Sequence, residues 1–112
     1  MYLPHADNTI VEREKIVAYL LNPSHLDNAG KASFFNSLGF SQDAWENLAL
    51  ALCNAAQQLP VSKTVASSHR MKYIVDGRIV SPNGKTAQLR SIWIIDVGLD
   101  TPRLVTAYPR EK

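Results

Sequence analysis

Cysteine is almost absent from the sequence: Cys53 is the only one in 112 residues. This excludes an internal disulfide and a cysteine-based zinc site. Because Cys53 lies within an apolar helical pattern, we expect it to be a small core residue. The histidines have no His-x-x-x-His spacing, so we expect no metal site and no cofactor. A Gly-rich phosphate loop, a Gly-x-Ser-x-Gly elbow and paired carboxylates on one element are also missing, which argues against kinases, serine hydrolases and glycosidases.

Long apolar runs are missing too, since none approaches the roughly 18 residues that span a bilayer. Residues 1–5 lack a basic region followed by an apolar stretch, so no signal peptide is expected. With 46% hydrophobic and 20% charged residues, the chain can bury a core. We therefore expect a single soluble domain over residues 1–112 that folds in a reducing cytoplasm.

Negative charge is scarce in the second half of the chain. Residues 1–60 carry three basic and six acidic side chains, a net charge of −3, whereas residues 61–112 carry nine and four, a net charge of +5. The basic half suits a polyanion partner such as RNA. Lysine and arginine that protect an exposed sheet edge would explain the same asymmetry.

Residues 10–59 predict three helices. The first follows the capping segment Asp7-Asn8-Thr9 and stops at Asn22-Pro23. The second runs from about Lys31 to Leu38, with Gly39 as a left-handed stop. The third is capped by Ser41, and its apolar positions recur at helical spacing as far as Leu59.

From residue 61 to about 108 the apolar period changes to two, which indicates strands. They are expected at residues 62–68 (a polar edge), 71–80 with a bulge at Gly77, 86–97 and 103–108. Short links, among them the turn Ser81-Pro82-Asn83-Gly84, favour an antiparallel meander. The predicted fold is α+β, with three N-terminal helices packed on four antiparallel strands.

His25 and Lys31 are the first candidates for chemistry. Lys31 lies in the first turn of the second predicted helix, where a cation opposes the helix dipole. Together with His25 in the preceding loop, it would form an anion site that contains an acid or base group. A loop histidine and a solvated lysine are the ordinary explanation. His69, beside Arg70, is the alternative functional histidine.

The sheet half supplies a second set of candidates. Lys72, Arg90 and Arg103 come from three strands and would converge on a polyanion if they share a face. Thr106 and Tyr108 are two residues apart, so they point to the same side of the last strand and could orient a phosphate. An ordinary strand threonine and a half-buried tyrosine are the simpler explanation.

Taken in order along the chain, several fragments resemble a family of short bacterial domains of unknown function. The matching fragments are Leu20-Leu21-Asn22-Pro23-x-His25, Gly30-Lys31-Ala32-x-x-Phe35, Leu38-Gly39-Phe40, Lys72-Tyr73-x-Val75-Asp76-Gly77, Arg90-Ser91-x-Trp93-Ile94 and Pro102 through Pro109. Domains resembling this one occur alone beside small antitoxin-like genes, or as the last module of polymorphic toxins. Their layout is similar to the superfold shared by barnase, EndoU, colicin ribonucleases and RelE.

The resemblance implies a toxin-like, metal-independent endoribonuclease, with RNA as substrate and an antitoxin or immunity protein as partner. In that reading His25 is the general base or acid, and Thr106 and Tyr108 position the scissile group. Phosphate would be held by Lys31, Lys72, Arg90 and Arg103. The alternatives are a non-catalytic nucleic-acid-binding domain and a protein-interaction domain of the immunity type.

Overall fold

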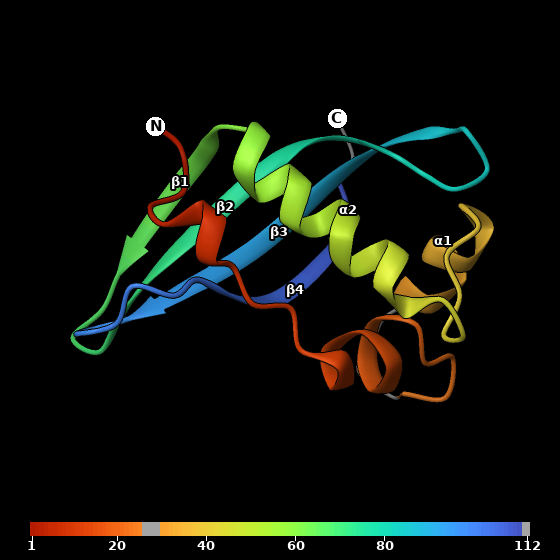
Figure 1. Cartoon of the computed structure of the whole chain (residues 1–112), viewed down its shortest axis with the longest axis horizontal. Helices are drawn as coiled ribbons and strands as arrows, with labels where there is room; N and C mark the ends of the chain where they lie inside the picture. The colour runs from red at the N-terminus through yellow and green to blue at the C-terminus, as the bar shows by residue number, and fades with distance from the viewer. Residues whose placement is uncertain (26–29, 111–112) are drawn as a thin grey trace.

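A four-stranded antiparallel sheet forms the centre of the computed structural model, which describes residues 1–25 and 30–110. The strands lie in chain order as β1 (Val61–Ala66), β2 (Arg70–Val80), β3 (Thr86–Asp96) and β4 (Arg103–Pro109) (Figure 1). This confirms the α+β class and the four-stranded meander. β1 is exposed along nearly its whole length, as expected for a polar edge strand.

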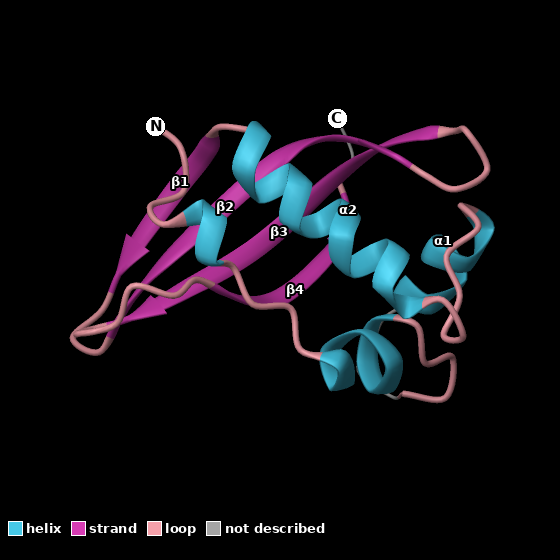
Figure 2. Cartoon of the chain, in the orientation of Figure 1, coloured by secondary structure: helices cyan, strands magenta, loops and turns pink. Residues whose placement is uncertain are grey.

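The helix α2 (Trp45–Gln58) crosses one face of the sheet (Figure 2) and buries Leu48 and Leu52 there. Beneath it Trp93 is fully buried. The indole Nε1–H of Trp93 donates a hydrogen bond to Ser91 Oγ at 2.9 Å, and Ser91 Oγ donates to the Val75 carbonyl at 3.4 Å. The polar atoms of this core are therefore paired, which avoids the cost of burying them without partners.

The second predicted helix is confirmed as α1 (Lys31–Ser37), and Gly39 adopts the expected left-handed conformation with φ of 95°. The third begins at Trp45, later than expected. Ser41 Oγ accepts a hydrogen bond from the Ala44 amide at 3.3 Å, so it caps a turn before the helix instead of the helix itself. Cys53, expected in the core, is only half-buried.

The first predicted helix is only roughly matched. Residues Ala6–Asn8 form a 3-10 turn (η1), and the helix that follows is the six-residue π-helix η2 (Lys15–Leu20). Between them Ile10 accepts a hydrogen bond from the Leu104 amide at 3.0 Å and donates one to the Pro102 carbonyl at 2.8 Å. Because this pairing with the start of β4 requires extended backbone, the predicted cap at residues 7–9 is wrong.

The sheet has bulges, but none at Gly77. Gly77 pairs in register with Leu89, and a Cβ atom there would lie 2.5 Å from Leu59 Cδ1, so the glycine makes room for that side chain. Two bulges lie elsewhere. In β1, Ser62 is the extra residue between Val61 and Lys63, which pair with successive residues of β2. In β4, Val105 is the extra residue between two positions paired with β3. Residues three apart normally face opposite sides of a sheet, but this bulge places Arg103 and Thr106 on the same side.

Candidate functional site

The sheet face opposite α2, called the outer face here, carries the candidate residues of the strands. Its rows follow from the register of β2, β3 and β4, since directly paired residues share a face. The rows are Asp76–Arg90–Tyr108, Ile74–Ile92–Thr106 and Lys72–Ile94–Arg103. The three predicted phosphate-binding cations therefore do share one face.

Tyr19 is the centre of a polar cluster beside β4. It comes from η2, which contacts β4. Its hydroxyl oxygen accepts a hydrogen bond from Lys31 Nζ at 2.5 Å and one from Thr106 Oγ1 at 3.4 Å. The ring of His25 meets the Tyr19 ring edge-on, with the centroids 4.9 Å apart. Lys31 Nζ also lies 5.8 Å from the centroid of the Tyr108 ring.

The electrostatics of this cluster favour the ionised form of Tyr19. Burial by itself would raise the pKa of the phenol. Hydrogen bonds from Lys31 and Thr106, together with the charges of Lys31 and Lys15, outweigh that effect and hold the Tyr19 pKa below its ordinary value. The hydroxyl is therefore a stronger acid than an ordinary tyrosine.

Three hollows in the described part of the chain border the cluster. One, about 340 Å³, is lined by Glu12, Glu14, Lys15, Ala18, Tyr19 and His25. The other two include residues of β4. The larger, about 470 Å³, is lined by Lys15, Tyr19, His25, Val105 and Thr106. The smaller, about 310 Å³, is lined by Gly30, Lys31, Tyr108 and Pro109. The bulge residue Val105 thus forms part of the wall of the larger hollow.

The structure brings four predicted site residues into this cluster. His25, Lys31 and Thr106 contact Tyr19, and the Tyr108 ring lies near Lys31 Nζ. These residues come from the loop after η2, from α1 and from β4, which are distant in sequence. His69 lies in the turn between β1 and β2, and Figure 1 shows this turn at the opposite end of the molecule from η2 (orange). It is not part of the cluster.

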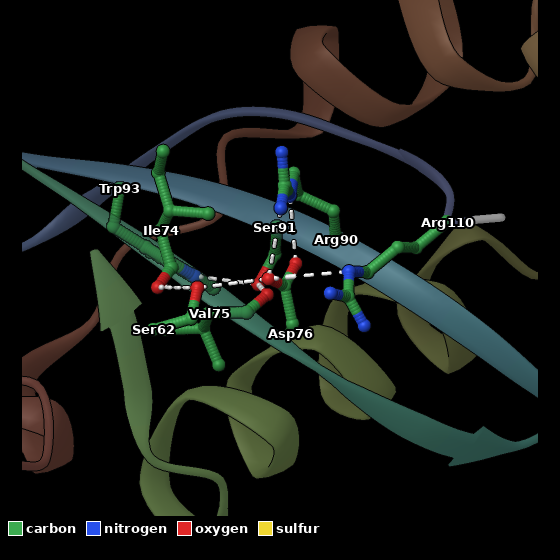
Figure 3. Close-up of polar contacts among 8 residues, drawn as sticks. All are labelled: Ser62, Ile74, Val75, Asp76, Arg90, Ser91, Trp93 and Arg110. Carbon is green, nitrogen blue, oxygen red and sulfur yellow. Dashed lines mark hydrogen bonds and ion pairs between the residues drawn. The ribbon is translucent and has the colours of Figure 1, made fainter. Parts of the chain in front are cut away.

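Of the predicted phosphate-binding cations, Arg90 is the one next to the cluster, and it is held by a carboxylate. Its guanidinium donates from Nε to Asp76 Oδ1 at 2.7 Å and from Nη2 to Asp76 Oδ2 at 3.0 Å (Figure 3). These bonds, and then the neighbouring Tyr108, raise the pKa of Arg90. Arg90 therefore bonds Asp76 on one side of its row, and on the other side its neighbour is Tyr108, whose ring lies near Lys31.

Asp76 has further partners. Arg110 Nε lies 3.4 Å from Asp76 Oδ2, and Ser62 Oγ donates to the same oxygen at 2.8 Å (Figure 3). The Asp76 side chain is 8% exposed. The hydrogen bonds from Arg90 lower the pKa of Asp76 most, and those from Ser62 lower it further. This buried carboxylate links β1, β2, β3 and the end of β4.

The other two cations stand in a different row, two rows away from Arg90 on either side of Ile94. Arg103 donates to Asp96 Oδ2 at 3.2 Å, so its charge is partly balanced. Lys72 is exposed and makes no ion pair with any residue of 1–25 or 30–110. Of the three, Lys72 is the cation most accessible to a polyanion.

Sequence reasoning missed Tyr19, although a signal was present. Ile16 and Leu20 are the buried residues of η2, and Tyr19 is an aromatic residue off that apolar stripe. The missed partner of Arg90 was Asp76, whose place opposite Arg90 requires knowledge of the β2–β3 register.

In the described part of the chain, no three histidine, cysteine, aspartate or glutamate side chains gather where they could hold a metal ion. None of its helices has the length and apolar character to cross a membrane.

Comparison with known proteins places the fold and the family. No curated protein matches the chain. A solved structure, described as a contact-dependent growth inhibition toxin–immunity protein complex from Klebsiella pneumoniae 342, contains a chain with the same fold. The two are 19% identical, the TM-score is 0.74, and the alignment covers 96% of this chain and 98% of that one. The sequence profile of a domain of unknown function, DUF6883, matches residues 2–111. The chain therefore belongs to the DUF6883 family.

Proposed function

We propose that the chain acts in a bacterial toxin–immunity system, as a metal-independent endoribonuclease. The observation that carries this is the cluster in which Tyr19 receives hydrogen bonds from Lys31 and Thr106 and touches the ring of His25. It combines two groups able to transfer protons with a cation that can bind phosphate. The fold shared with a chain of a growth inhibition toxin–immunity complex supports the biological setting.

The reaction assigned to the cluster is attack of a ribose 2′-oxygen on the adjacent phosphorus. His25 takes the proton of the 2′-hydroxyl as its oxygen bonds to phosphorus. The bond from phosphorus to the 5′-oxygen then breaks, and Tyr19 gives its proton to that oxygen. The products are a 2′,3′-cyclic phosphate and a 5′-hydroxyl. Lys31 offsets the charge that develops on the phosphate oxygens.

The remaining residues position this chemistry. Thr106 donates to the Tyr19 oxygen, and Tyr108 forms the second wall beside Lys31. Asp76 and Arg90 act through Tyr108 and are positioning residues. Lys72 and Arg103, on the same outer face, would hold phosphates further along the RNA.

The direct test is cleavage of a structured RNA by the purified chain in the presence of EDTA. We expect fragments with cyclic phosphate ends and 5′-hydroxyls, identified by mass spectrometry. Expression should also arrest growth, and the product of the neighbouring gene should relieve the arrest. RNA that is bound with salt-dependent affinity but never cut would overturn the catalytic proposal in favour of a binding domain.

Substituting Tyr19 tests its role as the acid. Tyr19→Phe keeps the ring and removes the hydroxyl, so we expect cleavage at pH 7 to fall about 100-fold. The wild-type rate should decline at high pH as the Tyr19 phenol loses its proton, with an apparent pKa below the ordinary tyrosine value of about 10. In Tyr19→Phe this basic limb should disappear. A wild-type basic limb that persists unchanged in the variant would assign the acid to another group.

The second candidate is an immunity-type protein that binds a toxin and does no chemistry. It is favoured by one observation, that the protein with the same fold is described as part of a toxin–immunity complex. A chain of this kind should leave RNA intact and should protect cells that express a cognate toxin. Growth arrest on its own expression would exclude this role.

A further inference from the structure

Lys31 lines the smaller of the two hollows that include residues of β4, and it donates a hydrogen bond to Tyr19, which lines the larger one. Its Nζ is 4.8 Å from the centroid of the Tyr19 ring, and Tyr19 lines the larger hollow. The same Nζ is 5.8 Å from the centroid of the Tyr108 ring, and Tyr108 lines the smaller hollow together with Lys31. The cation is thus close to one tyrosine ring of each hollow.

The size of each hollow suits one nucleoside. Ligand pockets begin at about 300 Å³, and the hollows of about 310 and 470 Å³ are at or not far above this lower limit. Each wall contains a tyrosine ring, and the larger hollow adds His25. Aromatic rings of this kind bind bases by stacking, which is tolerant of sequence.

We propose that the two hollows are adjacent nucleoside subsites, and that Lys31 holds the phosphate that joins the two nucleosides. The minimal ligand is then a dinucleotide step of single-stranded RNA. This inference rests on the proposed function and deepens it, since it states how the substrate lies. It also explains why a cation begins α1, where the helix dipole disfavours it.

Binding and cleavage can be measured separately with small ligands. The binding probe is a 2′-O-methyl dinucleotide, in which no 2′-hydroxyl remains to attack, tested as a panel of base combinations by calorimetry. The references are the nucleoside 3′-monophosphate and the 5′-monophosphate. Because the dinucleotide fills both hollows, we expect its Kd to be at least about tenfold lower than that of either mononucleotide.

Filling one hollow should remove this advantage. Val105→Trp occupies part of the larger hollow and Pro109→Trp part of the smaller one, so each should bring the Kd of the dinucleotide to that of a mononucleotide. The matched control is Val65→Trp on β1, at a side chain that is 41% exposed and outside both hollows. Two variants on different walls keep the test valid if one of them fails to fold.

The outcomes separate this inference from the proposed reaction. Equal affinity for the dinucleotide and the mononucleotides would overturn the paired subsites even if the 2′-hydroxyl dinucleotide is cleaved. A tenfold advantage that the tryptophan variants abolish, without any cleavage, would support the subsites and overturn the ribonuclease. An advantage that survives both tryptophan variants would place the dinucleotide elsewhere and would also contradict the inference.

Discussion

Replacing His25 with alanine is expected to lower the rate of RNA cleavage by about 100- to 10,000-fold, the usual contribution of a group that transfers a proton in the transition state. His25 lies in the loop after η2, is half-buried and stacks edge-on against Tyr19. It is not part of the hydrophobic core. The free energy of unfolding should therefore change by about 0.5 kcal/mol or less, as expected of a surface substitution, and the Tm should change little. Single-turnover cleavage and thermal unfolding of the same sample measure both effects.

His69→Ala is the matched control, because it removes an exposed histidine from the turn at the other end of the sheet. It should leave cleavage within about twofold of the wild type. If His69→Ala abolished cleavage and His25→Ala did not, the active surface would have to be moved to His69, Arg70 and Lys72.

The strands were more predictable from the sequence than the first helix, because the strand signals are local and the first segment is shaped by a distant contact. The alternation in residues 61–108 and the turn at residues 81–84 are local signals, and they locate the strands to within a few residues. The segment around Ile10 carries a helical pattern, yet it pairs with the start of β4. Such a tertiary contact overrides local propensity, and nothing in the local sequence reveals it.

The candidate site shows the same division between local and distant signals. Lys31 was singled out because a cation at a helix start is a local anomaly. The hydroxyl that accepts its hydrogen bond belongs to Tyr19, twelve residues earlier, and the third partner, Thr106, lies 87 residues beyond Tyr19. Arg103 shares a face with Thr106 only because Val105 is a bulge, which alternation along the strand does not predict.

Arg90 was predicted to hold phosphate. Because Arg90 is bonded to Asp76, we expect its substitution to affect the stability of the fold as well as the candidate site. Asp76 is the buried partner of Arg90, and it also bonds Ser62 and faces Arg110. Leaving a buried carboxylate without its partner lowers the free energy of unfolding by more than an exposed ion pair contributes to it. Substitutions in this network should therefore mainly lower stability. Their effect on the candidate site should be indirect, through the position of Tyr108.

Asp76→Asn should lower the free energy of unfolding by about 2–3 kcal/mol at pH 7, because hydrogen bonds from charged groups are each worth about 1.5–3 kcal/mol. The contacts lower the pKa of Asp76 in the folded state, so this stabilisation is present above the unfolded-state pKa of about 3.9. It is lost as the pH falls through the folded-state pKa, where the wild-type carboxyl becomes neutral like the asparagine.

Urea unfolding of both proteins from pH 7 down to pH 2 should therefore give two stability curves that converge below about pH 4. Asp100→Asn, at an exposed aspartate in the turn before β4, is the control and should change the free energy of unfolding at pH 7 by about 0.5 kcal/mol or less. Curves for Asp76→Asn and Asp100→Asn that coincide at pH 7 would show that desolvation of Asp76 cancels its attraction to Arg90 and Arg110. The network would then orient Tyr108 without stabilising the fold, and cleavage by Asp76→Asn would be the measurement that detects it.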